Sequence, residues 1–185
     1  GLSNLDSIVE FTYGTTDLVG AEMEIAYSLQ GSSDVLCTAP ISQPNLEILV
    51  DDAQCINGEY TFLQYSIFGK LRGIKQQRSL YEFSSDMTGS LLYTFSSDVT
   101  GMVNPTDSPW IYCVSTEDGK IHLLDTRKED VLVESITPSQ SAYVTSLTTD
   151  LYSIVTGSFW AGFSDGTLLE ISLQHDGTEE DYWFG

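Results

Sequence analysis

The sequence predicts an all-β fold built from about four repeated units of four strands each. Ile, Val, Tyr, Phe and Thr are frequent, and Ser, Thr and Gly separate the apolar runs, which is typical of strands joined by turns. Glycines that open a short alternating stretch recur every 47 to 50 residues, at Gly20, Gly69, Gly119 and Gly166. A period of this size accommodates four short strands and their turns.

The clearest unit lies in the second half of the chain. Residues 110–115 form an apolar run typical of a buried strand, and residues 120–125 alternate as the strand that returns from it. The Asp118-Gly119 pair between them tolerates positive φ and predicts a tight hairpin turn. Residues 131–136 then predict a further strand after a polar break.

The same order recurs towards the C-terminus. Strands are expected at residues 143–148, 154–163 and 167–173, and Asp165-Gly166 marks the second hairpin turn. Upstream, fainter strands are expected at residues 8–13, 20–29, 34–39, 46–50, 59–68, 70–75, 78–83 and 91–96. With the strands of a unit named a to d, the chain reads b-c-d, a-b-c-d, a-b-c-d, a-b-c, so the first unit lacks strand a and the last lacks strand d.

Residues 118–127, Asp-Gly-Lys-Ile-His-Leu-Leu-Asp-Thr-Arg, resemble the WD40-like β-propeller family, in which an Asp-Gly turn and an alternating strand recur every 40 to 50 residues. Leu124-Asp125 stands where Trp-Asp is usual, and residues 165–171 match the first half of the pattern. The resemblance covers about residues 88–173. No Gly-His dipeptide precedes a unit, so the family's buried histidine network is not expected in this chain.

The resemblance implies propeller-like blades, each a four-stranded antiparallel sheet. Because WD40-like rings usually need seven blades, about four units form either a complete four-bladed ring or an arc of a larger propeller. We favour the arc. Its open sheets would carry unpaired backbone groups, so missing sequence or a protein partner that completes the propeller is expected.

The chain is strongly acidic, with seven Lys and Arg against 27 Asp and Glu and a formal charge of −20. This charge repels phosphate backbones and anionic membrane surfaces, so neither nucleic acid nor a membrane is expected as a partner. It serves either as a solubilising surface or in recruiting a basic partner. No long apolar run or secretory signal is present, which favours a cytoplasmic or nuclear setting, and the three cysteines are expected to be reduced and buried.

No catalytic pattern stands out. The only histidines are His122, expected to be a structural or surface residue, and His175, expected to be solvated; no serine lies in a G-x-S-x-G elbow. Paired acids lack the spacing of a calcium loop. We therefore expect no enzymatic activity, no cofactor and no metal.

Two segments are candidates for binding a partner. Lys70, Arg72, Lys75 and Arg78 form a basic island within nine residues, which either docks an acidic segment or protects an exposed strand edge by charge. A propeller-like domain is expected over residues 1–175, followed by an acidic and aromatic tail at 176–185. Tyr182, Trp183 and Phe184 of this tail either anchor the chain in a partner's groove or form a last strand on a neighbouring blade.

The expected function is that of a non-catalytic protein–protein interaction scaffold and complex subunit built on WD40-like blades. A β-sandwich or jelly-roll subunit of a capsid or filament is the alternative, and a propeller enzyme with an unrecognised hydrolase site is the third. The near-constant repeat spacing favours the propeller.

Overall fold

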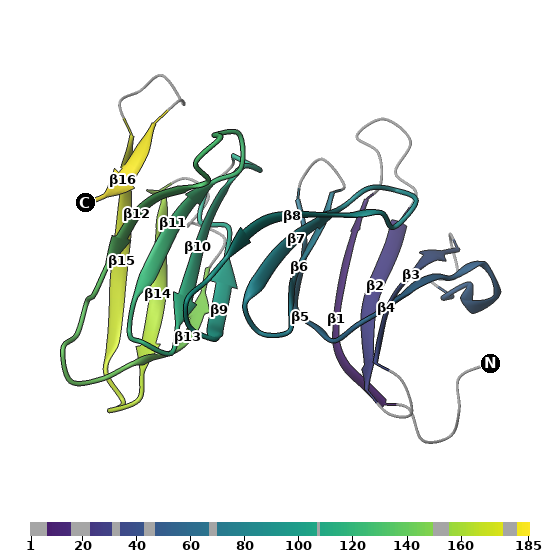
Figure 1. Cartoon of the computed structure of the whole chain (residues 1–185), viewed down its shortest axis with the longest axis horizontal. Coiled ribbons are helices and arrows are strands. Elements are labelled where there is room, and N and C mark those ends of the chain that lie inside the picture. The colour runs from purple at the N-terminus through teal and green to yellow at the C-terminus, as the bar shows by residue number, and fades with distance from the viewer. Residues whose placement is uncertain are drawn as a thin grey trace. The chain divides into compact units, whose positions relative to one another are not determined.

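Four antiparallel sheets of four strands each account for most of the computed structural model (Figure 1). The structure describes residues 7–15, 23–30, 34–42, 47–66, 70–106, 108–149, 156–175 and 181–185. Within this part of the chain, each sheet contains only strands that follow one another in sequence. The expected all-β fold with about four propeller-like units is confirmed, whereas a jelly roll would combine non-consecutive strands in each sheet.

The first two sheets lie in the first half of the chain. The first sheet contains β1 (Ser7–Thr15), β2 (Met23–Gln30), β3 (Val35–Ile41) and β4 (Gln54–Asn57). The second sheet contains β5 (Tyr60–Tyr65), β6 (Leu71–Lys75), β7 (Ser79–Phe83) and β8 (Gly89–Thr94). A short 3-10 turn, η1 (Val50–Asp52), precedes β4.

The other two sheets repeat this arrangement. The third sheet contains β9 (Val99–Val103), β10 (Ile111–Thr116), β11 (Ile121–Asp125) and β12 (Leu132–Ile136). The fourth sheet contains β13 (Val144–Thr148), β14 (Ser158–Phe163), β15 (Leu168–His175) and β16 (Tyr182–Phe184). Gly119 and Gly166 adopt φ of 82° and 87° in the β10–β11 and β14–β15 turns, which confirms both Asp-Gly hairpins. Gly20 and Gly69 lie outside the described residues.

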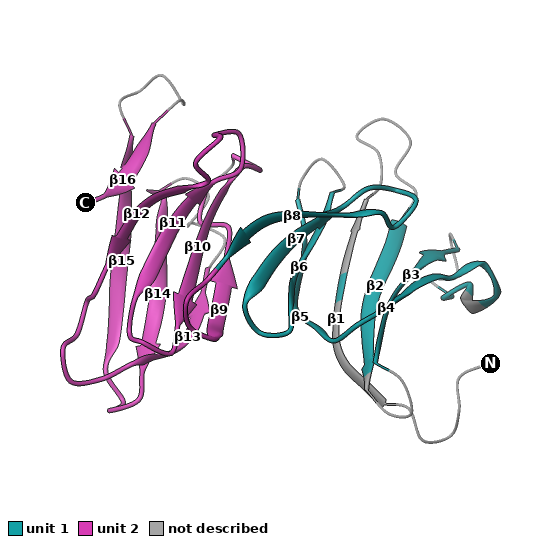
Figure 2. Cartoon of the chain, viewed as in Figure 1, with its two compact units in different colours: residues 1–94 teal, residues 95–185 magenta. Residues whose placement is uncertain are grey.

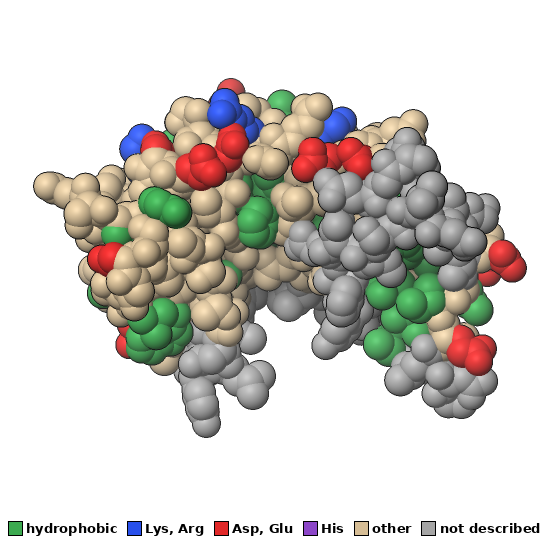
Figure 3. Space-filling model, turned by 90° about the horizontal axis from the view of Figure 1, so that it is seen from below, with side chains coloured by type: hydrophobic (Ala, Val, Ile, Leu, Met, Phe, Trp, Pro, Cys, Tyr) green, Lys and Arg blue, Asp and Glu red, His purple; other side chains and the backbone are tan. Residues whose placement is uncertain are grey.

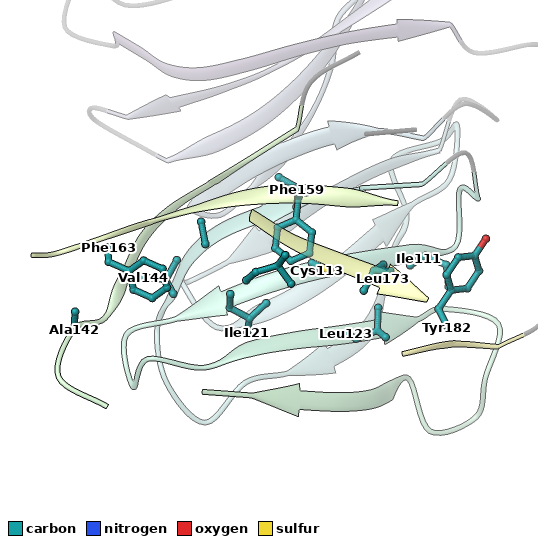
Figure 4. Packing of buried hydrophobic residues seen from close by; sticks show 13 residues of the cluster. Ile111, Cys113, Ile121, Leu123, Ala142, Val144, Phe159, Phe163, Leu173 and Tyr182 are labelled. Carbon is teal, nitrogen blue, oxygen red and sulfur yellow. The ribbon is translucent and has the colours of Figure 1, made fainter. Parts of the chain in front are cut away.

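The chain divides into two compact units, residues 1–94 and residues 95–185 (Figure 2). In the second unit, the third and fourth sheets bury their facing apolar side chains in one core. In Figure 4, labelled side chains from both sheets, among them Ile121, Leu123, Phe159 and Leu173, gather in this core. In the first unit, Ala26 and Leu36 of the first sheet pack with Tyr60, Leu71 and Phe83 of the second. Each unit is therefore a pair of sheets held together by burial of apolar surface.

The expected phase of the strands is wrong in the first half. The predicted inner strand at residues 46–50 is not formed over the part that is described: Ile48 makes only an isolated bridge to Ile41, and η1 follows. The main-chain N–H of Leu49 donates to the carbonyl of Pro40, so this segment folds back on the end of β3 instead of starting a new sheet.

The strand predicted at residues 91–96 also belongs elsewhere. It corresponds to β8, which pairs with β7 and is the fourth strand of the second sheet rather than the first strand of the third. The third sheet begins with β9, and neither β9 nor β4 is predicted from the sequence. Every sheet in the described part therefore has four strands, and neither the first nor the last unit is incomplete.

The expectation of three reduced cysteines is wrong for two of them. Cys37 and Cys55 are directly opposite each other on β3 and β4 and form a disulfide. Cys37 is buried with Tyr27 and Ala39, while Cys55 is exposed on the edge strand. Cys113 is a buried free thiol, and burial raises its pKa. Spacing alone did not show the pair because the register of β3 against β4 brings it together.

Glycine is required where the first strands of the third and fourth sheets lie side by side. A Cβ at Gly101 of β9 would lie 2.9 Å from the main-chain nitrogen of Leu147 in β13. We expect Gly101→Ala to lower the free energy of unfolding by about 1 to 3 kcal/mol, because the two strands must move apart. Urea denaturation measures this change.

Leu147→Ala, combined with Gly101→Ala, is the control for this prediction. Since the nearest atom belongs to the main chain, shortening the neighbouring side chain with Leu147→Ala should not rescue the variant. Unchanged stability of Gly101→Ala would contradict the close approach of β9 and β13.

Candidate functional site

A buried histidine of β11, His122, hydrogen-bonds to β10 on one side and to β12 on the other. His122 lies with its Nε2 3.0 Å from Thr116 Oγ1 and its Nδ1 2.8 Å from Ser135 Oγ. Thr116 donates its single hydroxyl proton to Asp118 Oδ1 at 2.6 Å, so its oxygen accepts from His122 Nε2–H, and Ser135 donates to Nδ1. This is a different network from the family's Gly-His network, which was not expected, and it gives His122 the first of its two expected roles, that of a structural residue. The histidine comes from within strand β11, not from a Gly-His dipeptide before the unit.

The ionisation of this network favours a structural role. Burial lowers the pKa of His122, which keeps the ring neutral at neutral pH despite the nearby carboxylate. Burial alone would raise the pKa of Asp118, but hydrogen bonds from Lys120 and Thr116 outweigh it and the pKa is lowered. The imidazole thus has its two nitrogens committed to neighbouring hydroxyls.

A buried carboxylate closes the end of β11. Asp125, which stands where the family pattern has the Asp of Trp-Asp, accepts from Arg127 Nε at 3.0 Å and from Arg127 Nη2 at 2.8 Å. Its Oδ1 also accepts from the Arg127 main-chain N–H at 3.0 Å. This bidentate Asp125–Arg127 ion pair fixes the turn that leads into β12.

The predicted basic island is spread over different environments. Arg72 is fully buried and shares the carboxylate of Glu82 with Lys70, at 2.5 Å and 2.7 Å respectively. Lys75 lies over the rings of Tyr60 and Tyr81, each 5.6 Å away. Arg78 is exposed in the turn between β6 and β7. The structure therefore brings Lys70 and Arg72 together and leaves the other two apart from them.

The three aromatic residues of the predicted tail form β16, which pairs with β15. Tyr182 and Phe184 face the core between the third and fourth sheets. The main-chain N–H of Phe184 donates to Glu134 Oε2 of β12 at 3.0 Å. Trp183 alternates with them and is 42% exposed. The three residues thus occupy the last-strand position, and one ring remains accessible.

The fourth sheet has a face that points away from the third sheet, which we call the outer face. By strand register it carries the side chains of Tyr143, Trp160, Leu168, Glu170, Gln174 and Trp183. Leu168 is 62% exposed and Tyr143 is 52% exposed. Large apolar side chains with this much exposure gathered on one sheet face are typical of an interaction surface.

Leu168 and Tyr143 are not among the site residues predicted from the sequence. The alternation of residues 167–173 held a usable signal, because Ile171 and Leu173 face the core and Leu168 and Glu170 must then face outwards. Trp183 is predicted from the sequence, as part of the aromatic tail.

The segment of sequence that contains the fourth sheet is acidic. Residues 129–185 contain ten Asp and Glu and no Lys or Arg. Glu170 is exposed on the face, and Asp165 is exposed in the adjoining β14–β15 turn. Hydrogen bonds from Thr167 lower the pKa of Asp165, so this carboxylate stays ionised at neutral pH. In the view of Figure 3, Lys and Arg side chains are seen beside Asp and Glu.

Two other kinds of site were sought among the described residues. No cluster of three or more His, Cys, Asp or Glu side chains there is arranged to hold a metal ion. None of the helices in the described part has the length and hydropathy of a membrane span.

Comparison with solved structures identifies the fold. The WD40 domain of Neurospora crassa Pan2 superposes with a TM-score of 0.59 at 11% identity, covering 95% of this chain and 49% of that one. BBS1N, solved in complex with ARL6DN, superposes with a TM-score of 0.63 at 14% identity, covering 89% and 50%. The chain has a WD40-like β-propeller fold. It spans about half the length of both of these propellers.

A third similar structure has nearly the same length. The computationally designed Ika4 protein superposes on this chain with a TM-score of 0.62 at 17% identity, and 89% of each chain is covered. No family model matches the sequence, and no curated protein matches it. At these identities the likeness to solved structures concerns the fold alone.

Proposed function

We propose that this chain is a non-catalytic protein–protein interaction scaffold that binds its partner through the outer face of the fourth sheet. The observation that carries this proposal is the exposure of Tyr143, Leu168 and Trp183 on one sheet face whose other side is a packed core. Aromatic and aliphatic anchors of this size supply most of the binding energy at protein interfaces.

Side chains of the types that often act in catalysis are bonded within single sheets and turns. His122 is bonded to two hydroxyls, Asp125 to Arg127, and Glu82 to Arg72. An active site needs a nucleophile or base held within reach of a substrate, whereas these groups are engaged with one another. Their arrangement supports a scaffold.

Propellers of similar fold supply a second kind of support. BBS1N was solved in complex with ARL6DN, so a propeller of this fold binds another protein. For the present chain the binding of a protein partner is an inference from the fold and from the outer face. A fold alone does not fix a function, which is why the proposal rests on named surface residues.

The proposal is tested by photo-cross-linking followed by reconstitution. A photoreactive side chain at position 168 is expected to capture a partner that the same group at position 91 does not. Leu91 of β8 is a matched control, since it is an exposed leucine (55%) on the second sheet. The captured protein is then purified and its affinity for the chain is measured.

We expect Leu168→Ser and Trp183→Ser each to weaken that affinity at least about tenfold, because each removes an apolar anchor. Leu91→Ser should leave the affinity unchanged. Equal binding of all three variants, or no capture specific to position 168, would refute the outer face as the binding surface.

A further inference from the structure

We infer that the partner of the outer face is a basic protein that places a Lys or Arg side chain between Glu170 and Trp160. This inference rests on the proposed function and specifies the chemistry of the partner. It is carried by the charge of the fourth sheet and by the register of β14 against β15.

The register brings an acid and an aromatic ring together at the centre of the face. Trp160 of β14 and Glu170 of β15 are directly opposite residues, so their side chains are neighbours on the outer face. A cation placed there gains an ion pair with the carboxylate and a cation–π contact with the indole. The pair is therefore suited to Arg or Lys.

The apolar anchors lie on either side of this pair. Leu168 precedes Glu170 by two residues on the same face of β15, and Trp183 is opposite Gln174, four residues beyond Glu170. At about 3.3 Å per residue, the face between the anchors is roughly 20 Å long. A partner segment with a central cation and an apolar group at each end matches this spacing.

The net negative charge of the chain reinforces the attraction of a basic partner. Residues 129–185 carry ten acids without a Lys or Arg, and the last basic residue, Lys128, is paired with Asp181 at 2.6 Å. No Lys or Arg of the fourth sheet competes for Glu170, because its described strands and turns contain neither. A basic partner is therefore attracted to this acidic chain at long range, and the exposed Glu170 offers it an ion pair on the outer face.

The same charges oppose a second copy of this chain as the occupant. Each copy has a formal charge of −20, and a second fourth sheet would bring its own carboxylates without a cation to meet Glu170. Like charges placed together at an interface cost affinity. Charge complementarity thus selects a basic partner over self-association.

The test uses three synthetic peptides on the full chain. One alternates serine with leucine and has a central arginine, and the other two have citrulline or glutamate at that position. Citrulline keeps the shape of arginine without its charge. Fluorescence anisotropy of the labelled peptides measures affinity at low and at high salt.

We expect the arginine peptide to bind at least about tenfold more tightly than the citrulline peptide, and high salt to reduce this difference. Glu170→Gln and Trp160→Leu should each remove most of the preference for arginine. Leu91→Ser on the second sheet should leave it intact.

The possible results separate this inference from the proposed function. Equal affinity for arginine and citrulline peptides overturns the basic partner, and if Leu168→Ser still weakens both peptides, the outer face survives as a binding surface. Absence of any binding by the arginine peptide also overturns the inference. So does sedimentation showing a dimer that Trp183→Ser dissociates, since the occupant is then a second copy.

Discussion

Replacing Glu82 with alanine is expected to lower the free energy of unfolding by about 3 kcal/mol. Arg72 of β6 is fully buried, and its Nε and Nη2 both donate to Glu82 Oε2 from the opposite position on β7. Removing the carboxylate leaves a buried guanidinium without this counter-charge, which is far costlier than losing a surface ion pair. Chemical denaturation followed by circular dichroism measures the change.

Lys70→Ala is the matched control for Glu82→Ala. Lys70 binds the same carboxylate at 2.7 Å, but its side chain is exposed, so its loss should cost less than about 1 kcal/mol. If Glu82→Ala is no more destabilising than Lys70→Ala, the buried ion pair does not stabilise the second sheet in the way proposed.

The pH dependence of stability provides an independent measure of the same pair. Burial alone would raise the pKa of Glu82, but hydrogen bonds from Lys70 and the charge of Arg72 outweigh it and the pKa is lowered. The stabilisation is therefore complete above the ordinary glutamate pKa and is lost as the pH falls through the lower pKa of the folded state. Glu82→Ala should show a smaller loss of stability than the native chain over this window.

Phe159→Ala is expected to cost about 4 kcal/mol, the usual range for truncating a fully buried phenylalanine. Phe159 of β14 lies in the core between the third and fourth sheets, where its neighbours cannot close the cavity completely (Figure 4). Leu168→Ala, on the outer face of the adjacent strand, should change stability by less than about 0.5 kcal/mol.

This pair of variants tests which way the fourth sheet faces. Thermal or urea unfolding of the two proteins is compared under the same conditions. A loss of stability for Leu168→Ala as large as that for Phe159→Ala would mean that the outer face is itself packed, and the proposed binding surface would be excluded.

The sequence predicted the strands that have strong local signals. Residues 110–115 and 120–125 are apolar or alternating and flank an Asp-Gly turn, and the structure places β10 and β11 there in antiparallel register. Whether these two strands form is decided by interactions between residues close in sequence, and these can be recognised in a single sequence. The repeat of about four units followed from the same turns.

The missed strands have weak local signals. β4 is short, polar and exposed on three of its four residues, and it is held by pairing with β3 rather than by its own pattern. β9 contains Gly101, a poor strand former, which is accepted because β13 passes too close for a side chain. Both strands are stabilised by partners distant in sequence, so reading the segments alone could not place them.

The binding surface was only partly predictable for the same reason. Trp183 stood out in an acidic tail, but its grouping with Leu168 and Trp160 depends on β16 pairing with β15 and β15 with β14. The basic island was conspicuous in sequence, yet its density along the chain did not show that Arg72 would be buried on Glu82.

The oxidation state of the Cys37–Cys55 pair at the edge of the first sheet depends on the redox state of the compartment that holds the protein. Cys37 and Cys55 are 18 residues apart, and their bond joins a buried position to an exposed one. Disulfides persist in oxidising compartments and are rare in the cytosol. Protein isolated from a reducing compartment, such as the cytoplasmic or nuclear setting expected from the sequence, should retain both thiol hydrogens. The intact mass of the isolated protein, which falls when the two thiol hydrogens are lost, therefore shows whether the protein came from an oxidising or a reducing compartment.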